Sequence, residues 1–203
     1  MKIIDITPLV SKTSPGFPGD VPLSIQMVTT GPARVSSFQM SAHLGAHVDA
    51  PLHLGAREDA SEIDLSRMMG DCQVIAVPSQ GAITREMLTS ISSKRVLIKT
   101  GFVLGSLWRD DFAYLTPQAT EYLIDCGVEL IGIDTPSIDK VDDETLQSHI
   151  LAIDASVLIL ENLFLSNVTP GRFQLIALPL KIAGLEASPV RAVLISDKES
   201  GCA

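Results

Sequence analysis

Three of the four histidines of this 203-residue chain lie within eleven residues, together with an aspartate. The segment reads His43-Leu-Gly-Ala-His47-Val-Asp49-Ala-Pro51-Leu-His53. Imidazoles and a carboxylate are the ligands of a zinc-like or manganese-like divalent ion, and a carboxylate can bridge two such ions. The alternative is a polar patch in which the histidines only satisfy hydrogen bonds, but it leaves their concentration in one short segment unexplained. The segment therefore predicts a metal site.

The four candidate side chains of this segment all fall at odd positions. In an extended chain successive side chains point to opposite faces, so these four would point the same way. A helix would carry Asp49 away from the face shared by His43 and His47, and Gly45 and Pro51 oppose a helix. We therefore expect an extended segment that ends in a proline-forced turn, with Gly45 leaving space for an ion.

The remaining histidine, His149, lies near the end of a helix expected over residues 143–150. The apolar strand expected over 157–160 delivers Glu161. A carboxylate at the end of a buried strand is costly to bury without a partner. Composition alone leaves two possibilities open for this pair: a surface histidine with a strand-end glutamate, or further groups of a functional site.

The elements that must position these residues are predicted to be rich in strands, and several apolar runs are typical of strands covered on both faces. The expected strands are 2–6, 34–44, 73–77, 95–99, 129–133, 157–160, 173–178 and 190–195. A helix is predicted to begin at Pro117 after the N-cap Thr116 and to end before Gly127. Weaker helical patterns cover 59–69, 84–91 and 143–150. Because strands outnumber helices and alternate with them only in the middle, we expect one mixed α/β domain over 1–203 with an antiparallel or barrel-like component.

Composition and charge exclude several classes of partner. The net charge is −9 and no Lys/Arg cluster interleaves with aromatic residues, so nucleic acid is not expected to bind. Asp5 interrupts the apolar N-terminus and no apolar run approaches the roughly 20 residues that span a bilayer, so no membrane association is expected. Cys72, Cys126 and Cys202 are widely spaced and odd in number, which favours free thiols and a cytoplasmic protein.

Four ordered segments of the chain resemble one known family. The motif His-x-Gly-[Thr/Ala]-His-x-Asp-Ala-Pro-x-His is similar to that of the cyclase-like, metal-dependent hydrolases, which include bacterial kynurenine formamidases. The resemblance extends over nearly the whole chain, and it implies the swivelling β/β/α fold of that family and a homodimer or higher homo-oligomer. The other three segments are Phe17-Pro-Gly-Asp20, Gly132-Ile-Asp-Thr-Pro-Ser137, and Ala177-Leu-Pro-Leu-Lys181 with Leu185-Glu-Ala-Ser-Pro-Val-Arg-Ala-Val-Leu194.

The resemblance implies a role for every histidine. His53 matches the general acid/base of the family, and Asp49 matches a carboxylate that bridges two metal ions. These ions are expected to be Zn²⁺, two per subunit, with Mn²⁺ also possible. The positions that match their ligands are His43, His47, Asp49, His149 and Glu161.

Two departures from the family pattern bear on the substrate. Phe17 stands where formamidases of the family commonly have tryptophan, and Asn162 stands where they often have glycine. A phenylalanine can still pack against an aryl substrate, although it lacks the indole N–H donor. Phe17 is therefore the expected substrate-binding residue, and neither departure touches a metal ligand.

The activity implied by the resemblance is hydrolysis of N-formyl-L-kynurenine to L-kynurenine and formate, a step in tryptophan degradation. A metal-bound hydroxide would attack the formyl carbon while His53 transfers the proton to the departing aniline nitrogen. The same metal chemistry would serve a relative that opens a cyclic amide such as isatin or cleaves another small amide or ester. A metal-binding protein without turnover is the third possibility, and His53, a proton-transfer group beyond the ligand set, argues against it.

Overall fold

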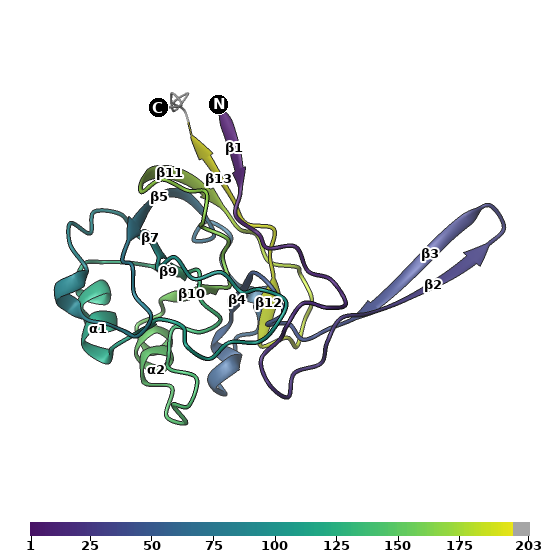
Figure 1. The fold of residues 1–203 in the computed structure, drawn as a ribbon, viewed down its shortest axis with the longest axis horizontal. Coiled ribbons are helices and arrows are strands. Elements are labelled where there is room, and N and C mark those ends of the chain that lie inside the picture. The colour runs from purple at the N-terminus through teal and green to yellow at the C-terminus, as the bar shows by residue number, and fades with distance from the viewer. Residues whose placement is uncertain (197–203) are drawn as a thin grey trace.

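A nine-stranded mixed sheet forms the centre of the computed structural model, which describes residues 1–196 (Figure 1). Its middle strands, β5, β7, β9 and β10, run parallel, and the strands on both flanks pair antiparallel. This arrangement confirms the predicted mixed α/β fold with an antiparallel component. In order across the sheet the strands are β1 (Lys2–Asp5), β13 (Val193–Ser196), β11 (Gly171–Ile176), β5 (Met69–Ala76), β7 (Arg95–Lys99), β9 (Leu130–Ile133), β10 (Leu158–Glu161), β4 (His47–Asp49) and β12 (Ala187–Pro189).

Apolar packing on both faces holds the central strands in place. In β7, Val96 and Ile98 pack into the cluster that also contains Leu123 of α1 and Ala152 of α2. The intervening Leu97 packs into a second cluster on the other face, as the alternation of side chains along a strand requires. The continuous apolar runs predicted for these strands are therefore confirmed, because both faces of the sheet are covered.

Two α-helices lie side by side on one face of the sheet (Figure 1). Helix α1 (Pro117–Asp125) begins as predicted, with the Thr116 side chain accepting a hydrogen bond from the backbone N–H of Ala119. Helix α2 (Gln147–Asp154) begins four residues later than the predicted 143–150, because Leu146 adopts a left-handed conformation with φ 47°.

The helices predicted over 59–69 and 84–91 are wrong. The structure has only single 3₁₀ turns there, at Ala60–Glu62 and Arg85–Met87. In the first segment the side chain of Asp64 accepts hydrogen bonds from the backbone and hydroxyl of Ser66. Such local bonds to the backbone compete with helix formation.

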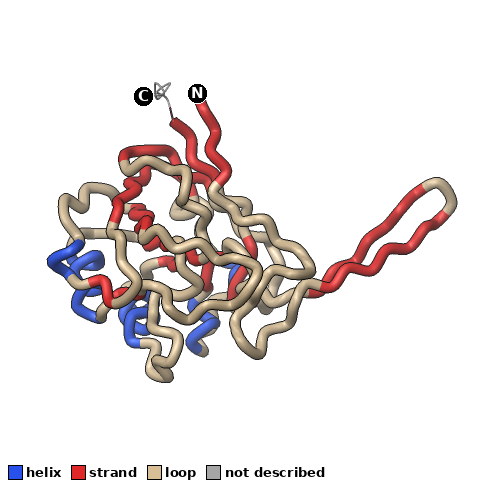
Figure 2. Tube along the Cα trace, viewed as in Figure 1, coloured by secondary structure: helices blue, strands red, loops and turns tan. Residues whose placement is uncertain are grey.

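A long hairpin leaves the body of the molecule (Figures 1 and 2). It consists of β2 (Ser24–Thr30), which the sequence patterns missed, and β3 (Ala33–Gln39), and every residue of both strands is exposed. The strand predicted over 34–44 therefore ends at Gln39 and does not run into the histidine motif. A smaller parallel pair, β6 (Ala82–Ile83) and β8 (Tyr114–Leu115), lies outside the main sheet.

Two further expectations concern membrane spans and thiols. Within residues 1–196, no helix combines the length and apolarity that crossing a bilayer demands. Cys72 is buried, Cys126 is exposed, and both are free thiols. Cys202 lies outside the described residues.

Candidate metal centre

The histidine motif is extended only at its middle. His47, Val48 and Asp49 form β4, whereas His43 lies in a turn and His53 lies on the 3₁₀ turn Pro51–Leu54. The prediction of one continuous extended segment is therefore wrong at both ends. The side chains still converge, because the turns before and after β4 bring His43 and His53 back toward Asp49, with the His43 and His53 ring centroids 4.7 Å apart.

Gly45 has a different role from the predicted one. It adopts φ +81°, a conformation that favours glycine, and a Cβ atom there would lie 2.4 Å from Cγ2 of Val10. The missing side chain thus allows the turn to pack against Val10. The prediction that it leaves space for an ion between the histidines is wrong.

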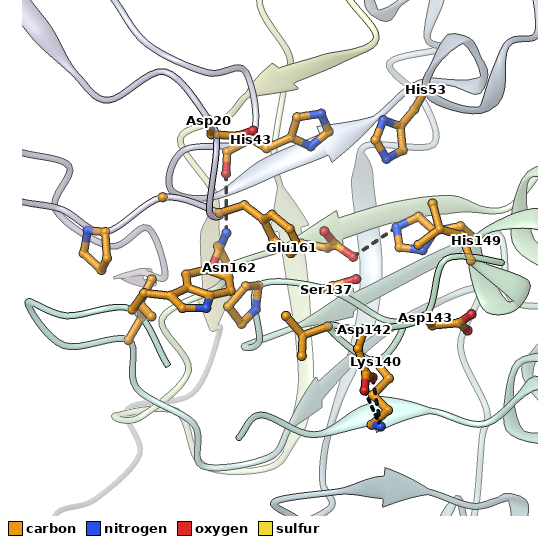
Figure 3. Close-up of a pocket in the computed structure, with 18 of the residues that line it drawn as sticks. Asp20, His43, His53, Ser137, Lys140, Asp142, Asp143, His149, Glu161 and Asn162 are labelled. Carbon is orange, nitrogen blue, oxygen red and sulfur yellow. Dashed lines mark hydrogen bonds and ion pairs between the residues drawn. The ribbon is translucent and has the colours of Figure 1, made fainter. Parts of the chain in front are cut away.

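Pairing of β4 with β10 brings the two distant halves of the sequence together. Glu161 lies opposite His47 in this antiparallel register, and Glu161 Oε2 is 3.4 Å from His47 Nε2. His149 on α2 completes the group, with its Nε2 3.4 Å from Glu161 Oε1 and 3.5 Å from Asp49 Oδ2. These four side chains are almost fully buried, whereas the side chain of His43 is 20% exposed. Figure 3 shows His43, His53, His149 and Glu161 converging on one space.

Burial and mutual contact shift the pKa values of these groups in opposite directions. Burial lowers the pKa of His47, but the Glu161 and Asp49 carboxylates outweigh it and raise that pKa to about 9. Burial likewise opposes ionisation of Asp49, yet the imidazoles of His149 and His43 hold its pKa well below the usual range. In the metal-free protein, a proton on the His47 imidazole therefore balances the negative charge of the Asp49 and Glu161 carboxylates. A metal ion that binds there must displace this proton.

The unsatisfied atoms of the cluster fit a divalent cation. Within residues 1–196, Nε2 of His47 and both carboxylate oxygens of Asp49 are buried without a hydrogen-bond partner, and burying such atoms is costly unless a cation binds them. The nitrogen–oxygen separations of 3.3–3.5 Å across the cluster are long for hydrogen bonds. Two ligands about 2.0–2.1 Å from one tetrahedral ion would lie roughly 3.3 Å apart, so the observed spacing suits nitrogen and oxygen ligands of zinc.

The donor atoms form two groups that share Asp49. One group is His47, Asp49 and Glu161, and the other is His43, Asp49 and His53. In each group the candidate ligand atoms lie within 4.8 Å of one another. A carboxylate shared between two such groups has an oxygen atom available for each of them.

Asp139 is a residue of the site that the sequence patterns missed. Its Oδ2 lies 2.7 Å from Nδ1 of His149, and its two oxygens accept hydrogen bonds from the backbone N–H groups of Ser148 and His149. It therefore caps the first turn of α2 and orients the histidine at the same time. The available signal was an aspartate two residues after the Gly132–Ser137 segment, but its distance of ten residues from His149 concealed the contact.

A pocket of about 530 Å³ opens beside the cluster and is lined by His43, His53, His149 and Glu161 at one end. Phe17 lies in its wall as expected and packs edge-to-face on Trp108, with ring centroids 5.1 Å apart. Trp108 also lines the pocket, and no motif in its surroundings singles it out in the sequence. Trp108, on a loop about ninety residues later, thus places an indole ring beside Phe17.

Lys140 and acidic side chains occupy another part of the pocket lining (Figure 3). Lys140 Nζ lies 2.8 Å from Oδ1 of Asp142, and both side chains are more than half exposed. This part of the pocket is polar, unlike the wall formed by Phe17 and Trp108.

Comparison with known proteins places the chain in a family. The Cyclase family model matches residues 4–140, which include the histidine motif and Asp139. The chain belongs to the cyclase family. This confirms the resemblance carried by the four motifs.

The relatives within the cyclase family that resemble this chain include several named kynurenine formamidases. The chain is 42% identical to that of Bordetella avium and 41% identical to that of Delftia acidovorans, in both cases over 95% of this chain and 97% of the relative. Identity to the kynurenine formamidase of Salinibacter ruber is 38%, over 96% of this chain and 97% of that protein.

Solved structures support the cyclase fold. A predicted metal-dependent hydrolase from Bacillus stearothermophilus superposes with a TM-score of 0.84 at 28% identity, covering 95% of this chain and 97% of that one. Isatin hydrolase A from Labrenzia aggregata superposes with a TM-score of 0.78 at 20% identity, covering 97% and 94%. The second likeness shows the shared fold alone. The Bacillus stearothermophilus structure and the kynurenine formamidase relatives together support a metal-dependent hydrolase that acts on a C–N amide bond.

Proposed function

We propose that the protein hydrolyses N-formyl-L-kynurenine to L-kynurenine and formate. The observation that carries this proposal is a cluster of unpartnered metal-ligand atoms at the end of a pocket walled by aromatic rings. Identity of about 40% to named kynurenine formamidases over nearly the full chain supports the same substrate. The pocket then receives the aryl ring while the formamide reaches the cluster.

The proposed ligands belong to two zinc ions that share Asp49, with manganese as the other candidate metal. Their donor atoms come from His149 and from the two ligand groups described above, with His53 left out. When bound, divalent ions at such a site lower the pKa of water and polarise a carbonyl group. The proposed metal ligands are His43, His47, Asp49, His149 and Glu161.

His53 is the proposed general acid/base. Burial lowers its pKa below the usual value of 6.5, so the imidazole is neutral near pH 7 and can accept a proton. Its ring lines the pocket between His43 and His149, with centroid distances of 4.7 and 5.8 Å. From there it can take a proton from the attacking water and return it to the aniline nitrogen as the C–N bond breaks.

The two chemically different parts of the pocket match the two ends of the proposed substrate. Phe17 and Trp108 provide an apolar wall for the aryl ring. Lys140 is the cation available for the α-carboxylate, while the acidic residues beside it suit the α-ammonium group. Isatin and simple aryl amides lack this amino-acid group.

Side-by-side turnover of three substrates tests the assignment. Zinc-loaded protein is expected to hydrolyse N-formyl-L-kynurenine with a higher kcat/KM than formanilide or isatin. Preference for isatin would favour the cyclic-amide alternative, and no turnover of any substrate would leave a metal-binding protein without catalysis. The isatin hydrolases share the fold at 20% identity, so their substrate carries less weight here.

The oligomer and the compartment are proposed on separate grounds. We propose a homodimer or higher homo-oligomer in which the exposed hairpin contacts a second subunit, because Met27, Val28 and Phe38 on it are at least 60% exposed. Light scattering coupled to size exclusion tests this state. Free Cys72 and Cys126 suit the proposed cytoplasmic location.

A further inference from the structure

Two of the clustered histidines are held by an acceptor on each side of the ring. His47 directs Nε2 toward Asp49 and Glu161, and its Nδ1 lies 2.9 Å from the backbone oxygen of Gly45. His149 directs Nε2 toward the same two carboxylates, and its Nδ1 lies 2.7 Å from Asp139. In both rings one nitrogen faces the cluster and the other is bound to an acceptor outside it. An outer acceptor of this kind sets the tautomer and orientation of a metal-ligating histidine.

His43 follows the same pattern with its nitrogens exchanged. Its Nδ1 lies 3.3 Å from Asp49 Oδ1, and its Nε2 lies 3.4 Å from Oε1 of Glu186. Within residues 1–196, no other carboxylate lies within ion-pair distance of this Nε2. We propose that Glu186 is a positioning residue: its carboxylate, at ion-pair distance, attracts the N–H of the outer nitrogen and thereby orients His43. The proposal rests on the proposed role of His43 as a metal ligand.

The backbone around Glu186 holds its carboxylate beside the cluster. Its carbonyl oxygen accepts a hydrogen bond of 2.9 Å from the N–H of Ala50. The next residue, Ala187, pairs with Asp49 in the β4–β12 ladder. Backbone pairing with Asp49 and Ala50 therefore holds Glu186 beside the central carboxylate, although it is more than 130 residues away in sequence.

The hydrogen bonds of His43 to Ser41 and Asn162 involve only its backbone. The hydroxyl of Ser41 accepts a hydrogen bond from the His43 N–H, and the amide of Asn162 donates to the His43 carbonyl. Because neither contact reaches the imidazole, they cannot choose which ring nitrogen carries the proton. A carboxylate at Nε2 favours a proton on Nε2 and leaves Nδ1 free to face Asp49.

Glu186 differs from the outer acceptor of His149 in its exposure. Its side chain is 42% exposed, whereas that of Asp139 is 3% exposed. Water competes with an exposed carboxylate, so His43 is the least rigidly oriented of the three rings. Loss of Glu186 should therefore weaken metal binding without unfolding the protein.

The test uses Co²⁺ as a spectroscopic probe and compares Glu186→Ala, Glu186→Gln and the control Glu58→Ala. Glu58 is an exposed glutamate whose side chain forms no hydrogen bond or ion pair within residues 1–196. We expect Glu186→Ala to bind the more weakly held Co²⁺ with about 10- to 100-fold lower affinity and to alter its visible absorption spectrum. Glu186→Gln, which keeps a hydrogen-bond acceptor, should recover most of the affinity, and the control should match the unmodified protein.

Each other outcome contradicts a different statement. Equal Co²⁺ affinity and spectra for Glu186→Ala and the unmodified protein would overturn the positioning role. If Glu186→Gln loses the ion as fully as Glu186→Ala, Glu186 is itself a ligand and the proposal is overturned. If the unmodified protein binds no Co²⁺ or Zn²⁺, the proposed metal site fails before Glu186 is tested.

Discussion

The two sides of the pocket are built in different ways. On the inner side, His47, Asp49 and Glu161 stand on paired strands and are buried. On the outer side, Phe17 and Lys140 stand on loops and are substantially exposed. Hydrogen-bonded strands hold donor atoms to the tolerance that metal coordination requires, whereas loops can change their side chains without disturbing the sheet. We infer that the inner side performs the chemistry and the outer side selects the substrate.

The largest effect is expected when the carboxylate shared by both ligand groups is removed. Asp49→Asn should lose both ions and reduce hydrolysis to the background rate, because an amide cannot bridge two cations. Metal content after dialysis and formate release measure the two effects. Asp154→Asn, an exposed position on α2, is the control and should leave both unchanged. Full metal content in Asp49→Asn would contradict the proposal that the inner side of the pocket binds the metal through Asp49.

Substitution of His53 separates proton transfer from metal binding. His53→Ala should lower kcat by roughly 100- to 10,000-fold with the metal content retained, since positioned acid/base groups contribute about that much. Mass spectrometry of the bound metal and steady-state kinetics measure the two quantities. Loss of metal in this variant would instead make His53 a ligand, which its position in the group with His43 and Asp49 would then explain.

The pH dependence of the metal-free protein tests the electrostatics of the inner side. The pKa of His47 is raised from 6.5 to about 9, so protonation of this ring in the folded state stabilises the fold. That contribution is fully present below pH 6.5 and is lost as the pH rises through about 9. Thermal melts with a chelator should therefore show the Tm of the unmodified protein falling between these values.

Two comparisons check this expectation. His47→Gln should show a smaller fall in Tm over the same pH range, since it lacks the titrating ring. Saturation with Zn²⁺ should also reduce the fall, because the metal takes the place of the proton. Identical pH profiles for the unmodified protein and His47→Gln would contradict the assignment.

On the outer side, Trp108→Ala should raise KM more than it lowers kcat. An aromatic pair contributes about 0.5–1.5 kcal/mol beyond its buried area, which corresponds to a change of roughly 2- to 10-fold. Leu107→Ala removes a neighbouring side chain that is 78% exposed and should have no effect. A loss of kcat without a change in KM would place Trp108 on the catalytic side of the comparison.

The smallest expected effect comes from the charged rim. Lys140→Met should raise KM for N-formyl-L-kynurenine by about fivefold or less, because an exposed ion pair is worth at most about 1 kcal/mol. The substitution should leave the KM for formanilide unchanged, since that substrate has no carboxylate. Lys94→Met removes another exposed ion pair, that with Glu129, and serves as the control. An equal rise in KM for both substrates would show that Lys140 does not bind the amino-acid group.

The chemistry of the site and much of the sheet could be predicted from the sequence. The histidine motif spans only residues 43–53, so it indicates a metal site without any knowledge of the tertiary structure. The apolar run of β7 and the Thr116-Pro117 helix start are likewise local signals, because burial on both faces and N-capping act within a few residues. The family resemblance then linked His149 and Glu161 to the motif, and the β4–β10 pairing shows how they meet.

Only the tertiary structure decided how the ligands are held and which residues line the pocket. Trp108 meets Phe17, Asp139 caps the helix of His149, and Glu186 reaches His43. Each contact joins residues whose separation in sequence leaves no periodic signal, because packing of loops and pairing of strands determine it. The role of Gly45 was misjudged for the same reason, since its partner, Val10, lies in a different segment of the chain.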